Sequence, residues 1–118
     1  METILKRFEN PDEERVFDKG HFALIRVGDV TIGRATYQPG WKWSVDVGPS
    51  AGTALCDVEH VGLVLKGHAV AAFADGTIVD LTAGTMFYIP PDPHDSWVVG
   101  DEEYVSLHFQ GAEKYAKS

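Results

Sequence analysis

One stretch decides the fold of this chain: Gly48 to Gly67, GPSAGTALCDVEHVGLVLKG. It begins with loop-forming residues, and after Asp57 it continues as an apolar alternation that is typical of a β-strand, whose side chains switch faces at every residue. Cys56 and His60 are four residues apart, so we expect both to face the same side. Together with the distant His94, a thiolate and two imidazoles would make a site for a borderline metal such as zinc.

Length and composition indicate one acidic domain. The chain has 118 residues and a formal net charge of −8, which argues against a nucleic acid or an anionic membrane surface as partner. A second hydrophobic core would need more residues than are left over. The single cysteine allows no internal disulfide, and the sequence carries no pattern of a signal peptide or membrane span. We therefore expect a cytoplasmic protein.

From residue 21 onward, turn residues divide the chain into short β-type runs. Gly28-Asp29 and Asp75-Gly76 are hairpin signals. About nine strands with no long helical period predict an all-β jelly-roll barrel over residues 21–110, between an N-terminal arm (1–20) and a C-terminal tail (111–118). The expected strands are residues 22–27, 30–37, 41–47, 58–65, 68–74, 77–81, 85–89, 94–99 and 104–109.

Both ends of the chain carry weak helical signals. Asn10 followed by Pro11 and acidic residues resembles a helix N-cap and first turn, and residues 111–117 favour a frayed terminal helix. The arm also contains Ile4, Leu5 and Phe8. These apolar residues are suited to covering an exposed β-edge, so we expect a homodimer.

The glycine frame around Cys56 resembles the first motif of the small single-domain cupins, G-x5-H-x-H-x3/4-E-x6-G. Gly48 and Gly67 fit the frame, whereas Ala54, Cys56 and His60 stand where the motif has two histidines and a glutamate. The resemblance implies a double-stranded β-helix, the cupin barrel, over about residues 22–109.

The second cupin motif, G-x5-P-x-G-x2-H-x3-N, is matched less fully. Gly84 and Pro90 fit its start, and His94 follows one residue early and without the usual glycine. Trp97 lies near the place of the final asparagine. Cupins include isomerases, dioxygenases, decarboxylases, storage proteins and sensors, so the resemblance does not fix a function.

The departures from the motif imply a softer set of metal ligands. Three histidines and a carboxylate, the usual cupin set, suit iron or manganese, whereas Cys56, His60 and His94 make zinc the leading divalent metal, with iron, copper or manganese as alternatives. Asp46 is the candidate fourth ligand. It would reach the interior only if the neighbouring tryptophans point outward or a bulge intervenes.

Each candidate ligand also has a structural interpretation. Cys56 fits the role of a small buried hydrophobe, and His60 and His94 fit that of histidines hydrogen-bonded within a pocket. His68 follows a turn, where a structural role is the simpler interpretation. The role of His108 depends on which face of its strand is inside, a choice that the sequence leaves open.

Four aromatic residues are candidates for the wall of a ligand pocket: Trp41, Trp43, Trp97 and Tyr88. The alternative is that they fill the barrel core or a dimer face. Asp95, next to His94, would orient a ligating imidazole or would act as a turn residue.

Two functional hypotheses follow. The first is a metal-binding small cupin that takes a small polar or organic-acid ligand in its barrel, with or without turnover. The alternative is a small-molecule binding or sensing cupin module that holds no metal.

Overall fold

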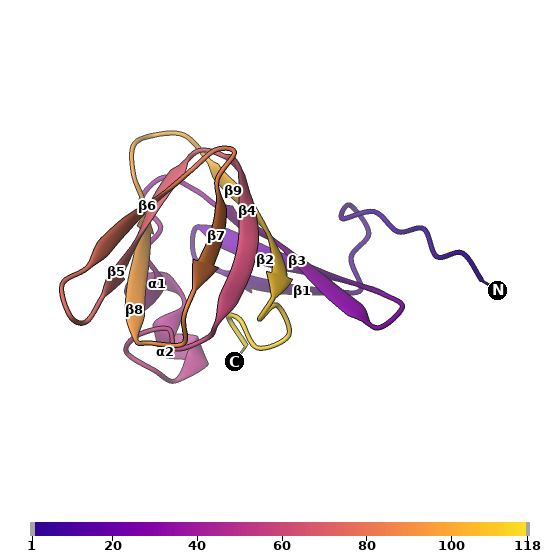
Figure 1. The fold of residues 1–118 in the computed structure, drawn as a ribbon, viewed down its shortest axis with the longest axis horizontal. Helices are drawn as coiled ribbons and strands as arrows, with labels where there is room; N and C mark the ends of the chain where they lie inside the picture. The colour runs from indigo at the N-terminus through magenta and orange to yellow at the C-terminus, as the bar shows by residue number, and fades with distance from the viewer. Residues whose placement is uncertain (1, 118) are drawn as a thin grey trace.

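The computed structural model describes residues 2–117, which form nine β-strands in two antiparallel sheets and two helical turns (Figure 1). This architecture confirms the expected all-β jelly-roll class. The elements are β1 (Glu13–Phe17), β2 (Gly20–Val27), β3 (Val30–Tyr37), α1 (Trp43–Asp46), α2 (Gly48–Ala51), β4 (His60–Lys66), β5 (His68–Phe73), β6 (Ile78–Thr82), β7 (Met86–Ile89), β8 (His94–Val98) and β9 (Tyr104–Gln110).

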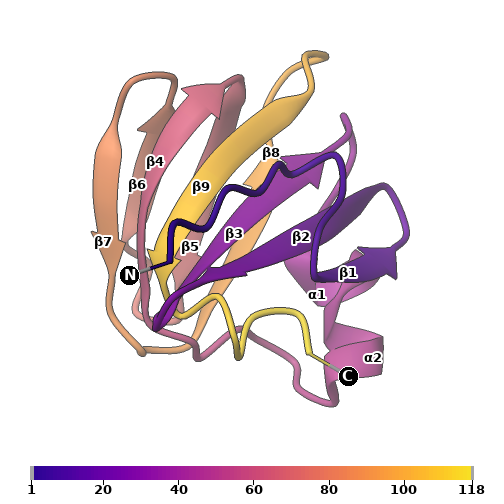
Figure 2. The same ribbon diagram turned by 90° about the vertical axis from the view of Figure 1, so that its right-hand side faces the viewer.

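The two sheets face each other around one core. The larger sheet has the strand order β1-β2-β3-β9-β4-β7, and the smaller has the order β6-β5-β8. Figure 2 shows β9 between β3 and β4, with α1 and α2 at one end of the barrel. Because β9 pairs with β3 on one side and β4 on the other, it joins the first hairpin to the rest of the barrel.

The glycine turns place the hairpins where the sequence predicts them. Gly28 and Gly76 adopt φ values of 59° and 95°, the left-handed region that glycine enters without steric penalty. They connect β2 to β3 and β5 to β6. The strand expected at residues 30–37 is found with those bounds.

The strand expected at residues 41–47 is wrong, because this stretch forms α1 and ends at Val47, the residue that precedes α2. In a strand, Trp43, Val45 and Val47 would share a face, but Val45 is 63% exposed while the other two are buried. Helical periodicity explains this, since residues four apart share a helix face and residues two apart do not. The alternation of apolar residues was therefore misleading over this short segment.

The acidic N-terminal segment is also different from its prediction. Glu13 and Glu14 belong to β1, which pairs with β2, rather than to a helical turn. The Asp12 carboxylate accepts the Arg26 amide at 2.7 Å and so extends this ladder by one side-chain bond. At the other end, residues 111–117 form turns rather than the expected helix.

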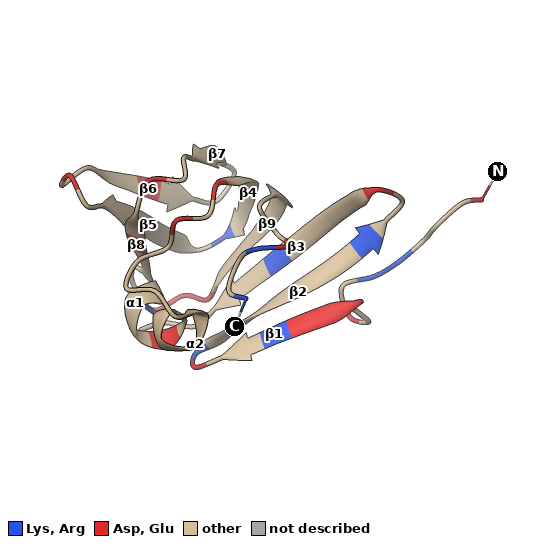
Figure 3. Ribbon diagram, turned by 90° about the horizontal axis from the view of Figure 1, so that it is seen from below, with Lys and Arg blue, Asp and Glu red and all other residues tan. Residues whose placement is uncertain are grey.

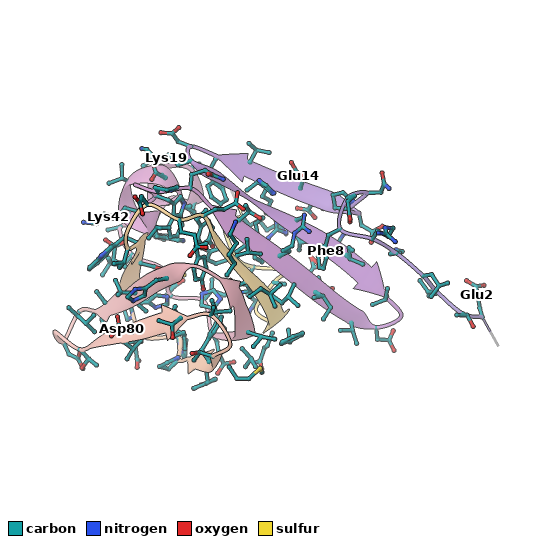
Figure 4. All side chains as sticks on the ribbon, turned by 90° about the horizontal axis from the view of Figure 1, so that it is seen from above. Glu2, Phe8, Glu14, Lys19, Lys42 and Asp80 are labelled. Atoms are coloured by element: carbon teal, nitrogen blue, oxygen red, sulfur yellow. The ribbon has the colours of Figure 1, made fainter. Side chains whose placement is uncertain are left out.

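The part of the N-terminal arm near Phe8 packs on the sheet, whereas the part before it extends away from the barrel. The Arg34 guanidinium lies 5.0 Å above the ring of Phe8, and Ile25 and Ile32 line the same shallow hollow. Figure 4 shows Glu2 well beyond Phe8, far from the barrel. No helix within residues 2–117 is long and apolar enough to cross a membrane.

Candidate metal centre

Three side chains meet inside the barrel: Cys56, His60 and His94. One potential ligand atom from each lies within 4.8 Å of the other two. The three residues are only 2%, 4% and 3% exposed. In the described part of the chain, this is the one group of three or more histidine, cysteine or acidic side chains that could hold a metal ion.

The convergence depends on pairing between distant segments. Cys56 lies before β4 and forms an isolated bridge with His94, in which each amide donates to the other's carbonyl at 2.9 Å. His60 is the first residue of β4 and pairs with Ile89 of β7. The expected grouping is thus present, but it does not arise from two positions on one strand.

Backbone contacts fix the ring of His94 in a form suited to ligation. Its Nδ1 lies 2.9 Å from the Asp92 carbonyl oxygen, which can only accept a hydrogen bond. Nδ1 therefore carries the proton, and the lone pair of Nε2 is left for another partner. An imidazole oriented in this way through its other nitrogen is the usual arrangement for a metal-ligating histidine.

Cys56 and His60 are already spaced like two ligands of one ion. The Cys56 Sγ and His60 Nε2 atoms are 3.5 Å apart. On a tetrahedral zinc, with bonds of about 2.3 Å to sulfur and about 2.0 Å to nitrogen, such atoms lie about 3.5 Å apart. No two ligand atoms of the group are more than 4.8 Å apart, which exceeds that value by about 1.3 Å. A small side-chain adjustment therefore closes the set around one ion.

Burial keeps the isolated side chains neutral. It raises the pKa of the Cys56 thiol to about 12 and lowers the pKa of His94. The pKa of His60 falls well below its ordinary value, first through burial and then through the nearby His108 and His94. Neutral imidazoles can ligate at once, whereas the thiol must lose its proton, which a bound cation promotes.

A small cavity with a mixed lining lies against this group: His60 and His94 line it, and the Cys56 Sγ lies 3.5 Å from the His60 Nε2. Its volume is about 40 Å³, and a single water needs about 10–15 Å³ on this measure. Its polar lining includes the three residues Ser96, Ser106 and His108 and the tyrosines Tyr37, Tyr104 and Tyr115. An ion and one or two small ligands therefore fill it.

His108 is a site residue that the sequence did not assign. It is 6% exposed, its Nε2 lies 3.0 Å from the Ser106 hydroxyl, and its Nδ1 has no hydrogen-bond partner. His60 Nδ1 is likewise buried without a partner. A buried polar atom without a partner costs free energy, so this interior is arranged for something other than stability alone.

Asp46, the candidate fourth ligand, lies outside the group. Its carboxylate accepts the Lys42 amide at 2.8 Å and lies 3.5 Å from the Lys19 ammonium. It therefore stabilises the first turn of α1, whose amides have no partners within the helix. The helix explains this placement, because the strand on which the expectation depended is not formed.

Trp41 and Trp43 are core residues rather than cavity walls. Both are buried, at 0% and 3% exposure, and Trp41 stacks on Tyr37 with their ring centroids 3.7 Å apart. Neither lines the cavity that contains His60 and His94. Their position supports the alternative that these aromatics fill the barrel.

Trp97, Asp95 and Tyr88 point away from the cavity because of strand alternation. On β8, His94 and Ser96 face inward, so Asp95 and Trp97 face the other side. Asp95 accepts the Ser44 amide at 3.0 Å, and Trp97 lies beneath the Lys42 ammonium.

Tyr88 and His68 also lie outside the cavity. Tyr88 is 57% exposed, and its hydroxyl donates a hydrogen bond to Glu59. His68 pairs outside the barrel with Asp80 at 2.8 Å.

Comparison with solved structures identifies the fold. A structural-genomics protein from Rhizobium leguminosarum bv. viciae 3841 is similar at a TM-score of 0.64 and 21% identity, over 92% of this chain and 95% of that one. A cupin domain from Bordetella pertussis Tohama I is similar at a TM-score of 0.54 and 15% identity, over 77% of this chain and 91% of that domain. Oxalate decarboxylase from Lactobacillus farciminis, solved as a formate complex, is similar at a TM-score of 0.59 and 19% identity, over 84% of this chain and 30% of that enzyme.

No protein-family model and no curated protein sequence matches this chain. The fold and the interior group define an all-β barrel with a cysteine and histidines at its centre. The chain is a small cupin-fold domain, as the two glycine-framed motifs predict. At these levels of sequence identity the likeness concerns the fold.

Proposed function

We propose that this protein is a metal-binding small cupin that holds a divalent transition metal through Cys56, His60 and His94. One observation carries the proposal: the ligand atoms of a buried thiol and two buried neutral imidazoles lie within 4.8 Å of one another, and both imidazoles line a small cavity. The mixture of one sulfur and two nitrogen donors favours zinc over the harder manganese or magnesium. Iron and copper are the next candidates.

The protein residues divide into three roles. Cys56, His60 and His94 bind the ion, and the Asp92 carbonyl orients His94. When bound, such an ion supplies Lewis acidity, and with one thiolate among its ligands it keeps a net charge of about +1. His108, whose Nδ1 has no partner, is placed to accept or donate a hydrogen bond to a small ligand in the cavity.

A small polar molecule is the proposed partner of this centre. The lining offers imidazole nitrogens and the hydroxyls of Ser96, Ser106 and Tyr115, but no lysine, arginine or carboxylate. Such a lining suits small neutral molecules or small anions attracted by the ion. Asp46, the candidate fourth ligand, and Asp95, the candidate partner of His94, do not line the cavity.

Metal content of purified protein tests the proposal. Protein prepared without chelators is expected to contain about one equivalent of a transition metal, and Cys56→Ser is expected to weaken binding at least about tenfold because the thiolate is lost. The matched control is His68→Asn, which removes a histidine that faces away from the cavity and should leave metal content unchanged.

Two outcomes would contradict the proposal. One is wild-type protein with less than about a tenth of an equivalent of any transition metal and no thermal stabilisation by added zinc. The other is a Cys56→Ser variant that retains metal as tightly as the wild type. Small-ligand binding that persists in a metal-free Cys56→Ser protein would favour the metal-independent binding or sensing module instead.

A further inference from the structure

The residue that closes the cavity comes from the C-terminal segment, residues 111–117. Tyr115 is 4% exposed, and its ring centroid lies 4.9 Å from that of His60 and 5.5 Å from that of His108. Its hydroxyl forms a hydrogen bond of 2.5 Å with the hydroxyl of Tyr37. Tyr115 therefore contacts the candidate metal centre directly, although it lies after the last strand of the barrel.

Side chains rather than a β-ladder hold this segment in place. Its amides bond within the segment only at Lys114 and Tyr115, both to the Gly111 carbonyl. Arg15 of β1 donates to the carbonyls of Ala112 and Tyr115, at 3.1 and 2.6 Å. Figure 3 shows basic residues (blue) on β1, β2 and β3. Arg26 of β2 binds Glu113 of the segment at 2.9 and 2.8 Å.

Gly111 gives the segment a natural pivot. Its φ is 87°, which other residues rarely adopt, and a Cβ here would collide with the Glu59 carbonyl oxygen. Beyond this glycine, the chain leaves β9, and residues 111–114 line one groove with Asp57, Val58 and Pro91. In Figure 1 this part of the chain is yellow and lies at the lower end of the barrel.

The segment lies between two spaces of very different size. Tyr115 lines the inner cavity of about 40 Å³, whereas Ala112, Glu113 and Lys114 line an outer groove of about 740 Å³. Asp57 and Val58, which follow Cys56, line the same groove. The segment therefore contributes to the lining of both spaces.

We propose that residues 111–117 are a plug over the candidate metal centre and that Tyr115 determines which ligands can enter. With the plug in place, the cavity admits an ion and ligands of about three heavy atoms, because a single water already takes about 10–15 Å³ of its volume. Larger ligands bind only when the plug moves about Gly111. The choice of metal-directed ligands depends on the proposed function, whereas the closure of the cavity does not.

The first test compares a small and a larger metal-binding probe. Full-length protein is loaded with Co²⁺ in place of the native metal, and azide and imidazole are titrated by visible absorption. Wild-type protein is expected to bind azide and to exclude imidazole. Tyr115→Ala and Arg15→Ala should raise the affinity for imidazole relative to azide by at least about tenfold. Tyr115→Phe keeps the ring and should behave like the wild type.

The second test needs no metal. The Cys56 thiol is buried and lies 3.5 Å from the Nε2 of His60, which lines the cavity, so its alkylation by iodoacetamide in metal-free protein reports on access to this interior. Tyr115→Ala and Arg15→Ala should react at least about tenfold faster than the wild type and Tyr115→Phe. Leu24→Ala removes a fully buried side chain that does not line the cavity, so it controls for a general loss of stability. It should react much more slowly than the two plug variants.

The two tests separate the plug from the metal. The proposal would be overturned if wild type and Tyr115→Ala had the same ratio of imidazole affinity to azide affinity. It would also be overturned if Cys56 were alkylated at the same rate in wild type, Tyr115→Ala and Arg15→Ala. Alkylation as fast in Leu24→Ala as in the plug variants would also overturn it, because labelling would then follow unfolding. If the protein failed to bind Co²⁺ but the alkylation rate still depended on the plug residues, the result would contradict the metal function and support the plug.

Discussion

His108 illustrates how burial determines the protonation state of single residues in this interior. Burial lowers its pKa from 6.5 to about 4, because the surrounding protein solvates the imidazolium poorly. Between these two values the unfolded chain binds a proton that the folded chain does not. The free energy of unfolding is therefore highest above pH 6.5 and falls as the pH decreases towards 4.

We predict that His108→Phe flattens this acid dependence. The variant keeps an aromatic ring beside Phe22 and Phe87 but cannot bind the proton. In metal-free protein, lowering the pH from 6.5 to 4 should reduce the free energy of unfolding of both proteins. The reduction should be about 3 kcal/mol smaller in the variant than in the wild type. Urea unfolding at a series of pH values measures this. Parallel curves for the two proteins would show that His108 does not titrate there.

Strand β9 shows what the sequence could not decide at the residue level. Tyr104, Ser106 and His108 alternate with Val105, Leu107 and Phe109, so two faces are evident. Hydrophobicity would place the second set inside, yet the first set is buried and Phe109 is 41% exposed. Local rules are broken most often at functional sites, and this reversed face is the signal that could have identified His108.

At the level of elements, α1 depends on a side chain from β8. Asp95 accepts the Ser44 amide at 3.0 Å and the Ser44 hydroxyl at 2.7 Å. These bonds satisfy groups at the helix start that α1 itself cannot pair. Asp95 therefore acts as a cap supplied by a neighbouring strand, and it faces away from the cavity that contains His94.

We predict that Asp95→Ala weakens the fold without affecting metal. Loss of the cap should lower the free energy of unfolding by about 1–2 kcal/mol. Metal content should stay at the wild-type level. Asp80→Ala, which changes an exposed carboxylate on β6 of the same sheet, serves as the control and should change neither quantity. A folded Asp95→Ala protein that lost its metal would instead show that Asp95 orients His94.

The elements differ in how well the sequence predicts them. Strands bounded by glycine turns, such as β3 and β5, are predicted within a residue or two, because the turn fixes the register. The structure of residues 41–47 is not predicted correctly, because a short apolar alternation does not distinguish a strand from one helical turn. The Cys56–His94 bridge joins residues 38 positions apart, and only the cupin motifs indicated it.

At the scale of the whole molecule, the N-terminal arm points to self-association. Leu5 is 88% exposed and Ile4 is 42% exposed, and this part of the arm extends away from the barrel (Figure 1). Exposed apolar residues on an extended arm are suited to packing against a second copy of the chain. The homodimer expected from the sequence stays a prediction.

Light scattering tests this prediction. At micromolar concentration, we expect a mass twice the 13.0 kDa of one chain. Leu5→Asp should shift the mass towards one chain, because it introduces a charge into the apolar contact. Ile78→Asp, at an exposed apolar position on β6, on the other side of the barrel from the arm, should remain dimeric. A wild-type mass of one chain would contradict the dimer.

Anomalous scattering from a crystal, measured at the zinc absorption edge, tests the central claim most directly. The account predicts one strong peak inside the barrel, within bonding distance of Cys56 Sγ, a ring nitrogen of His60 and Nε2 of His94. Measurements at the iron and copper edges would identify either of those metals at the same place. A crystal grown from metal-supplemented protein that showed no peak at these three residues would contradict the account.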